Sequence, residues 1–128
     1  MSAEDNRRTV ERLVRALNEH DLDLFDAQFH EDSIIDYPQS GERIVGRANR
    51  RATYEAFPRL PTVTPSTIST AGELAVLEAT FDYGDGVPWH AIIVFELRDG
   101  RIARERAYWA QPFEPAEWRA EWVERVDG

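Results

Sequence analysis

The chain contains no cysteine among its 128 residues. This absence excludes disulfide bonds, thiolate metal sites and cysteine nucleophiles. The chain also lacks any apolar run that approaches the roughly 20 residues needed to span a bilayer. Its first residues, MSAEDNRRTVE, carry no apolar core of a signal peptide. These absences predict a cytoplasmic protein that has no membrane partner.

Basic residues are the minority among the charged side chains. The 24 acidic and 15 basic residues give a formal net charge of −9. Binding to the phosphate backbone of a nucleic acid is therefore disfavoured, and no nucleic-acid partner is expected. Several arginines nevertheless cluster in one segment, and we interpret them as the solvated face of a helix. They are Arg43, Arg47, Arg50 and Arg51.

Motifs that would hold a metal or a phosphate group are also missing from the sequence. His20, His30 and His90 are scattered, and no HExxH or His–carboxylate cluster is present. The segments GDG (84–86) and RDG (98–100) are typical of hairpin turns rather than of phosphate-binding loops. The sequence therefore predicts neither a metal site nor a cofactor.

Helical periodicity is clearest in the first part of the chain. Apolar residues recur at i, i+3, i+4 and i+7 from Val10 to Leu17, which predicts a first helix. Asp21 can cap a second, shorter helix that extends to Phe29. A third helix is expected after Gly46, so the N-terminal half should contain three helices.

Patterns that favour strands occupy most of the remaining chain. One short strand, 33–36, is expected before the loop YPQSGERIVG (37–46). Beyond residue 61, β-branched residues and glycine-containing turns predict longer strands. These strands are expected at 62–70, 74–83, 89–97 and 102–109. Helices followed by antiparallel strands indicate an α+β fold, and the length indicates one domain over 1–128.

The C-terminal segment 113–126 predicts one more short helix, with Pro115 in its first turn. Trp118, Trp122 and Val126 recur at i, i+4 and i+8, which places them on one face. An aromatic stripe at helical spacing usually packs against other side chains. We interpret it as packing, either at one end of the sheet or at a subunit interface.

Longer segments carry a resemblance to a known superfamily. VERLVRALNEHDLDLFDAQFHEDSIID resembles the opening helix pair and first strand of nuclear transport factor 2-like (NTF2-like) proteins, which include ketosteroid isomerases and SnoaL-like polyketide cyclases. GERIVGRANRRATYEAFP resembles their next loop and third helix, and VFELRDGRIARERAYW their last hairpin. The resemblance covers about residues 9 to 110. It implies a strongly curved mixed or antiparallel sheet wrapped around three helices as a cone, with the loop 37–46 at the rim of an apolar pocket.

The resemblance also implies where a ketosteroid isomerase would hold its catalytic groups. Its helix-one tyrosine falls on Leu13, its proton-shuttling aspartate on Tyr37 and its protonated aspartate on Ile93. Leu13 and Ile93 can neither move a proton nor donate a hydrogen bond. If the alignment shifts by one residue, Asp36 becomes the base, but the oxyanion donors are still missing. We therefore do not expect ketosteroid isomerase activity.

Side-chain alternation in the last hairpin selects Glu105 as a candidate acid or base. If residues 98–100 form a three-residue turn, Ile93 lies opposite Glu105. Because Ile93 falls at a pocket-facing position of the family, Glu105 should face the pocket together with Trp109. A two-residue turn would reverse this parity. Burial there would raise the pKa of the carboxyl; the alternative is an exposed Glu105 that pairs with a neighbouring arginine.

Two further side chains are candidates for chemistry. Tyr37, at the pocket rim, would hold or polarise an oxygen of the ligand. His90 lies near the mouth of the cone and suits proton transfer near neutral pH. The alternation points His90 outward, however, so a position at a subunit interface is its alternative. The apolar wall of the pocket is expected from Trp89, Ile93, Phe95, Trp109 and Phe57.

Together, these expectations describe a protein that binds a small, largely apolar organic molecule. Its chemistry would be cofactor-independent acid/base catalysis of the isomerase, cyclase, dehydratase or epoxide-opening type. The alternative is a non-catalytic, dimeric ligand-binding or interaction module of the same fold. The resemblance implies a homodimer through the convex face of the sheet. A closed apolar cavity with a shielded carboxylate would favour the enzyme.

Overall fold

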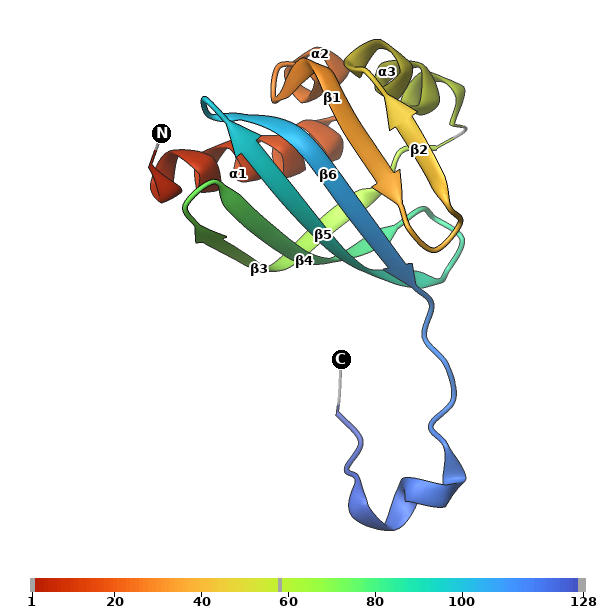
Figure 1. The fold of residues 1–128 in the computed structure, drawn as a ribbon. Helices are drawn as coiled ribbons and strands as arrows, with labels where there is room; N and C mark the ends of the chain where they lie inside the picture. Colours follow the sequence, from red (N-terminus) through yellow and green to blue (C-terminus); the bar gives the residue numbers. More distant parts are fainter. Residues whose placement is uncertain (1, 58, 127–128) are drawn as a thin grey trace.

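The computed structural model describes residues 2–57 and 59–126 (Figure 1). The helices are α1 (Ala3–Glu19), α2 (Leu22–Asp26) and α3 (Arg47–Ala56). The strands are β1 (Phe29–Tyr37), β2 (Glu42–Val45), β3 (Thr62–Ala71), β4 (Leu74–Asp82), β5 (Pro88–Arg98) and β6 (Arg101–Ala110). A short 3-10 helix, η1 (Glu117–Trp122), lies near the C-terminus. The predicted α+β class is confirmed.

All six strands belong to one mixed sheet with the order β2-β1-β6-β5-β4-β3. β1 and β6 are parallel, and every other pair of neighbours is antiparallel. Figure 1 shows the three helices on one side of this sheet. Only α1 and α3 are substantial helices, and the sheet is not strongly curled. The tightly wrapped cone with three full helices is therefore not what the structure shows.

The core lies between α1 and the inner face of the sheet. Ser2 and Asp5 cap the start of α1 reciprocally, which satisfies backbone N–H groups that have no partner inside the helix. The predicted apolar face of α1 from Val10 to Leu17 is buried, as are alternate residues of β4 and β5. Each large apolar side chain buried in this way contributes about 1.5–3 kcal/mol.

The segment between the second and third helices contains more strand than expected. β1 begins at Phe29, which pairs with Ile102 of β6, so Phe29 belongs to a strand and not to the end of a helix. The predicted loop 37–46 contains β2, which forms a hairpin with β1. Both pairings depend on a neighbouring strand. Strand propensity in the local sequence therefore does not predict them.

The turn between β5 and β6 also differs from the prediction. Arg98 pairs with Arg101, so the turn has two residues, Asp99 and Gly100, both with positive φ. The expected three-residue turn is wrong. Ala103 then lies in a β-bulge that adds one residue to β6. The bulge restores the expected alternation, and Glu105 faces the inside of the sheet.

The C-terminal segment does not form the predicted helix over 113–126. It contains η1, and no residue of η1 is buried. Trp118 and Trp122 are exposed, so the interpretation that they pack is wrong within this chain. Figure 1 shows the segment leaving the end of β6 and running away from the sheet. Within residues 2–57 and 59–126, no helix combines the length and the apolar character needed to cross a membrane.

Candidate functional site

Arg50 is a buried cation on α3, with 4% of its surface exposed. The prediction that the arginine cluster is solvated is therefore wrong for Arg50. α3 turns Arg50 and Tyr54, which are four residues apart on one helical face, toward the core. Its alanines Ala48, Ala52 and Ala56 are exposed. The inward face of α3 is thus built from polar and aromatic side chains.

The guanidinium of Arg50 links three side chains, one on its own helix and two on the strands β1 and β6. Its Nη2 donates to Glu105 Oε2 at 3.2 Å and to Tyr54 Oη at 3.2 Å. Its Nη1 donates to the hydroxyl of Tyr37. The guanidinium also lies over the rings of Tyr54 and Phe25, at 4.8 and 5.6 Å from their centroids, a geometry that stabilises a cation. Glu105 is 1% exposed, so its predicted burial is confirmed.

Burial and ion pairing shift the pKa values of Arg50 and Glu105 in opposite directions. Burial raises the pKa of Glu105 above its ordinary value, and the nearby Arg50 offsets part of that increase. Burial alone would lower the pKa of Arg50, but Glu105 and the two tyrosines hold it above its usual value. We therefore treat Arg50 and Glu105 as a charged pair that neutralises itself inside the core.

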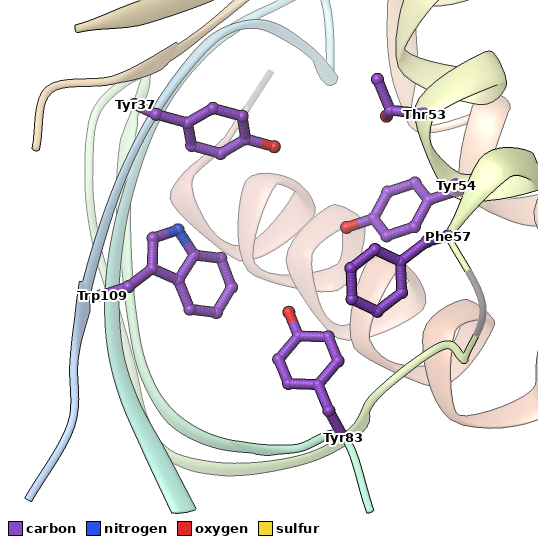
Figure 2. Close-up of a pocket in the computed structure, with 6 residues that line it drawn as sticks. All are labelled: Tyr37, Thr53, Tyr54, Phe57, Tyr83 and Trp109. Carbon is purple, nitrogen blue, oxygen red and sulfur yellow. The ribbon is translucent and has the colours of Figure 1, made fainter. Parts of the chain in front are cut away.

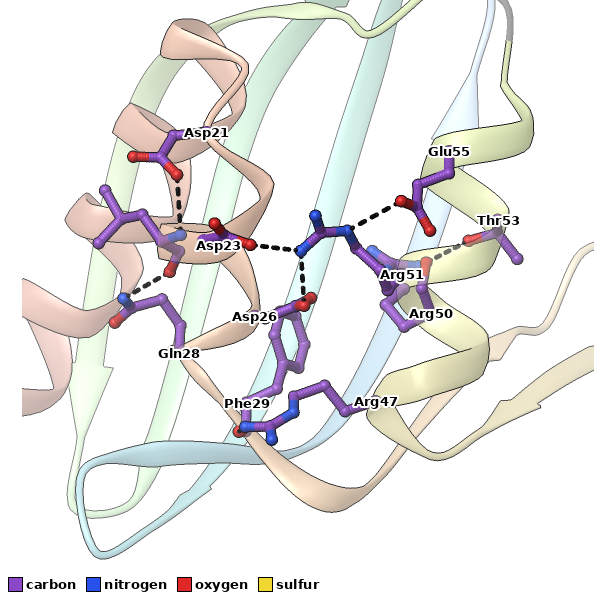
Figure 3. Close-up of polar contacts among 11 residues, drawn as sticks. Asp21, Asp23, Asp26, Gln28, Phe29, Arg47, Arg50, Arg51, Thr53 and Glu55 are labelled. Atoms are coloured by element: carbon purple, nitrogen blue, oxygen red, sulfur yellow. Dashed lines mark hydrogen bonds and ion pairs between the residues drawn. The ribbon is translucent and has the colours of Figure 1, made fainter.

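Arginines on either side of Arg50 hold α3 in place (Figure 3). Arg51 Nη1 donates to Asp23 at 3.0 Å and to Asp26 at 2.9 Å, both on α2. Arg47 donates to the backbone oxygen of Phe29, at the start of β1, at 3.3 Å. These contacts tie both halves of α3 to α2 and β1. They fix the position from which Arg50 enters the core.

A cavity of about 210 Å³ lies next to the two tyrosines that Arg50 contacts (Figure 2). Its lining residues come from β1, α3, β6 and the end of β4, and we call this cavity the cleft. They are Tyr37, Thr53, Tyr54, Phe57, Tyr83 and Trp109. The cleft continues into a more open recess that Trp89 and Asp85 line. It is open to solvent, so it is not the closed cavity that would favour an enzyme over a ligand-binding module.

Three phenol hydroxyls point toward the middle of the cleft in Figure 2, those of Tyr37, Tyr54 and Tyr83. The oxygens of Tyr37 and Tyr54 accept hydrogen bonds from Arg50, so each O–H has its own proton to donate. Burial raises the pKa of Tyr37 and of Tyr54, and it raises the pKa of Tyr83 to about 12. All three groups are therefore donors at neutral pH. The cleft combines apolar walls with neutral O–H donors, an arrangement that suits an oxygen acceptor on an apolar molecule.

Comparison with known proteins places the chain in a family. Residues 10–105 match the family model of the SnoaL-like domain. The chain belongs to the SnoaL-like domain family. No functionally curated protein matches this SnoaL-like chain.

Solved structures share the fold of this SnoaL-like protein. A candidate ketosteroid isomerase from Kribbella flavida is 27% identical over 98% of this chain and 93% of its own, with a TM-score of 0.90. An NTF2-like protein of unknown function from Burkholderia xenovorans is 33% identical, over 97% of both chains, with a TM-score of 0.88. An LEH-like epoxide hydrolase from M. tuberculosis is 26% identical over 84% of both chains, with a TM-score of 0.74.

The predicted site residues of the SnoaL-like protein separate into two groups. Trp89, Phe57 and Trp109 line the cleft or its recess, as does Tyr37. Phe95 is fully buried in the core and is not among the cleft residues. His90 is exposed and, as the alternation predicted, does not face the interior. The structure therefore does not bring His90 together with Glu105 and Tyr37.

Glu105 lies behind Arg50 and does not line the cleft. Together with Ile93 and Trp109 it borders a separate internal void of about 10 Å³, a volume that corresponds to about one water molecule. Leu13 and Ile93 occupy two of the positions where a ketosteroid isomerase would carry functional groups. Leu13 is also buried and borders the same void. The carboxylate of Glu105 is shielded from solvent, as expected. It contacts Arg50, however, and does not face the apolar pocket.

Sequence reasoning missed Arg50, Tyr54 and Tyr83. One signal was present, because Arg50 and Tyr54 are four residues apart on the same helix. This spacing alone does not say whether the shared face is buried. For metal binding, residues 2–57 and 59–126 contain no group of three or more His, Asp or Glu side chains that could hold an ion.

Proposed function

We propose that the protein binds a small, largely apolar organic molecule through one oxygen atom, which Tyr37 and Tyr54 polarise. The observation that carries this proposal is the double contact of Arg50 with both tyrosine hydroxyls at the cleft. The aromatic rings of Phe57, Tyr83 and Trp109 would surround the apolar part of the ligand. Burial of apolar area contributes about 25 cal/mol per Å² to binding before its entropic costs.

The electrostatics of the cleft favour chemistry that places negative charge on that oxygen. A hydroxyl that accepts a hydrogen bond from a cation donates its own proton more strongly. Fixed donors of this kind stabilise a developing oxyanion without reorganisation. The reactions that fit are proton transfer next to a carbonyl, as in isomerisation, aldol cyclisation and dehydration, or the opening of an epoxide. None of them needs a cofactor.

Glu105 would act in this site as a positioning residue. Its carboxylate holds the guanidinium at 3.2 Å and balances its charge, so Arg50 can stay charged beside the two tyrosines. In this proposal, the direct acid/base role first considered for Glu105 becomes an indirect one through Arg50. His90 has no part in the proposed site because its side chain does not reach the cleft.

A ligand-binding role without turnover is the second candidate. It is favoured by the lining of the 210 Å³ cleft, which among the described residues includes no carboxylate and no histidine. A base for proton transfer would have to come from outside the cleft, either from Asp85 in the outer recess or from Glu42 in a neighbouring hollow that also borders Tyr37 and Trp109. Binding and turnover therefore have to be measured separately.

Binding is tested with a matched pair of probes, the bicyclic ketone α-tetralone and its oxygen-free analogue tetralin. We expect the protein to prefer the ketone by up to about tenfold, because one hydrogen bond between neutral groups is worth about 0.5–1.5 kcal/mol. Tyr37→Phe and Tyr54→Phe should each reduce this preference. Tyr108→Phe is the control, because Tyr108 is an exposed tyrosine on the outer face of the sheet. Equal affinity for both probes, or a preference unchanged in both cleft variants, would overturn the proposal.

Turnover is tested by exchange of the α-protons of α-tetralone in deuterated water, followed by NMR. Acceleration by the wild-type protein that Tyr54→Phe reduces would support an enzyme. Tight binding of the ketone without any acceleration would support the ligand-binding role instead. The two candidate functions are thus distinguished on the same probe.

A further inference from the structure

A second hollow, of about 370 Å³, lies at the opposite end of the sheet from the cleft. α1 provides one of its walls, and the turn between β5 and β6 provides another; Figure 1 shows these two elements together beside the N-terminus. Arg101 in this hollow and Trp109 in the cleft are eight positions apart on β6, which corresponds to roughly 25 Å along a strand. We call it the polar hollow, and its polar lining includes Asp5, Arg8, Arg12, Gln28, Asp99 and Arg101.

Arg12 is held in the polar hollow by two uncharged side chains. Its Nε donates to Gln28 Oε1 at 3.1 Å, and its Nη2 donates to Thr9 Oγ1 at 3.2 Å. Gln28 Nε2 donates to the backbone oxygen of Leu24 at 2.9 Å, which turns the amide oxygen toward Arg12. Thr9 Oγ1 donates its own proton to the backbone oxygen of Gly100 at 2.7 Å. Because Thr9 and Gln28 are both buried, the guanidinium is fixed in place without a charged partner.

The positive charge of Arg12 is not neutralised by its neighbours. The chain has 24 acidic side chains, yet Arg12 takes part in no ion pair within residues 2–57 and 59–126. A guanidinium has five N–H groups, and the contacts with Gln28 and Thr9 use two of them. One N–H of Nη2 and both of Nη1 remain. These terminal nitrogens can hold two oxygens of one carboxylate or phosphate side by side.

Charged side chains of both signs complete the polar hollow. Arg8 and Asp5 balance each other, with their charged atoms 3.6 Å apart. Arg101 is exposed and, in the part of the chain that the structure describes, forms no ion pair. Asp99 is the remaining carboxylate. Arg12 and Arg101 thus face one carboxylate, and this combination suits a ligand that carries an anionic group and a hydroxyl group.

We propose that the polar hollow binds a small organic anion, a hydroxylated phosphate ester or carboxylate, through Arg12 and Arg101. Arg12 holds two oxygens of the anionic group, and Arg101 approaches the same group from the turn between β5 and β6. Asp99 accepts a hydrogen bond from a hydroxyl of the ligand. The volume of about 370 Å³ exceeds that of an inorganic ion and lies in the range of sites for small organic molecules. This site does not depend on the function proposed for the cleft.

Titration of the full chain with inorganic phosphate, at an ionic strength held constant with chloride, tests the anion site. NMR follows the Nε–H signal of Arg12 and the backbone amides of Gly100 and Arg101, where we expect saturable shifts. Arg12→Gln should weaken phosphate binding about tenfold or more, because it removes charge-assisted hydrogen bonds. Asp99→Asn should strengthen it about twofold, because it removes a repelling charge and asparagine tolerates the positive φ of this position.

Two further variants separate a built site from the general effect of charge. Arg15→Gln is the matched control, because it removes the same charge three positions further along α1, from a side chain that is exposed and pairs with Glu19. It should leave phosphate binding unchanged. Arg101→Gln, a change at an exposed residue, should weaken binding several-fold even if Arg12→Gln disturbs the fold. An equal loss in Arg15→Gln and Arg101→Gln would overturn the proposal.

Glycerol 2-phosphate, malate and glycerol then identify the class of the ligand. Tighter binding of glycerol 2-phosphate than of malate would support a phosphate ester, and the reverse order would support a carboxylate. We expect Asp99→Asn to weaken the preference for glycerol 2-phosphate over inorganic phosphate, because the variant loses the acceptor for the hydroxyl groups. If inorganic phosphate, glycerol 2-phosphate and malate all fail to bind saturably, or bind no better than glycerol, the polar hollow is not an anion site. Tyr54→Phe in the cleft should change none of these affinities.

Discussion

Arg50 and Glu105 form an ion pair inside the core, 55 positions apart in sequence and 3.2 Å apart in space. The pair connects α3 to β6 and places a positive charge directly behind Tyr37 and Tyr54. Removing two charges from water costs several kcal/mol per ion, so such a pair is weak evidence for stability by itself. In the proposed function, the cation serves instead the two hydroxyls that it contacts beside the cleft.

Glu105→Gln should destabilise the protein strongly. The substitution leaves the buried guanidinium of Arg50 without a counter-charge, which costs about 3–5 kcal/mol. Urea unfolding at mildly alkaline pH measures the loss in free energy of unfolding. Glu96→Gln is the control, because Glu96 pairs with Arg106 at 2.6 Å on the solvent side of the sheet, where such a pair is worth at most about 1 kcal/mol. Equal losses in the two variants would show that the buried pair carries no special cost.

Asp36 should contribute to stability in a pH-dependent way. Hydrogen bonds from Arg43 and then Arg104 lower the pKa of Asp36 from 3.8 to about 2. Since the carboxyl binds its proton less tightly in the folded chain, the contribution is present above pH 3.8 and is lost as the pH falls toward 2. In Asp36→Asn, the free energy of unfolding should therefore fall less steeply as the pH is lowered toward 2. We call this acidic part of the stability curve the acid limb. Asp32→Asn, a change at an exposed carboxyl, should leave that limb unchanged, and a flattening by both would refute the assignment.

The orientation of Glu105 was predictable from strand alternation, but the turn that supported it was not. The turn is one residue shorter than expected, and the bulge at Ala103 adds one residue back. Because the two differences offset each other, the residues of β6 still face the predicted sides of the sheet. The pairing between the strands shifts, so that Phe95 and not Ile93 lies opposite Glu105. A short sequence such as RDGR is compatible with both turn lengths, because glycine accepts the positive φ of either.

The burial of Arg50 could not be read from the local sequence. A run of arginines is most often a solvated face, and the buried carboxylate that reverses this expectation lies on a distant strand. For the same reason β2 was missed, since GERIVG becomes a strand through its pairing with β1. The apolar face of α1, in contrast, depends on a local period and was predicted correctly.

The turn that sets the register of β6 should be sensitive to substitution. Gly100 has a φ of 75°, a conformation that costs other residues about 1–2 kcal/mol. Gly100→Ala should lower the free energy of unfolding by about this amount. Asp99→Gly, at a φ of 53°, should be neutral or slightly stabilising because it relieves the same strain. Thermal unfolding of both variants checks the pair, and a Gly100→Ala variant as stable as Asp99→Gly would be inconsistent with the observed turn.

The placement of α3 should control binding from outside the cleft. Arg51 does not line the cleft but joins α3 to Asp23 and Asp26 of α2. In Arg51→Ala, α3 loses this anchor, and Arg50 and Tyr54 move relative to Tyr37. We expect the affinity for α-tetralone to fall several-fold while tetralin, which needs no hydrogen bond, is affected less. Arg15→Ala removes an exposed pair with Glu19 on α1 and should change neither affinity. If Arg51→Ala lowers stability but leaves the ketone preference intact, the position of α3 does not set the geometry of the hydroxyls.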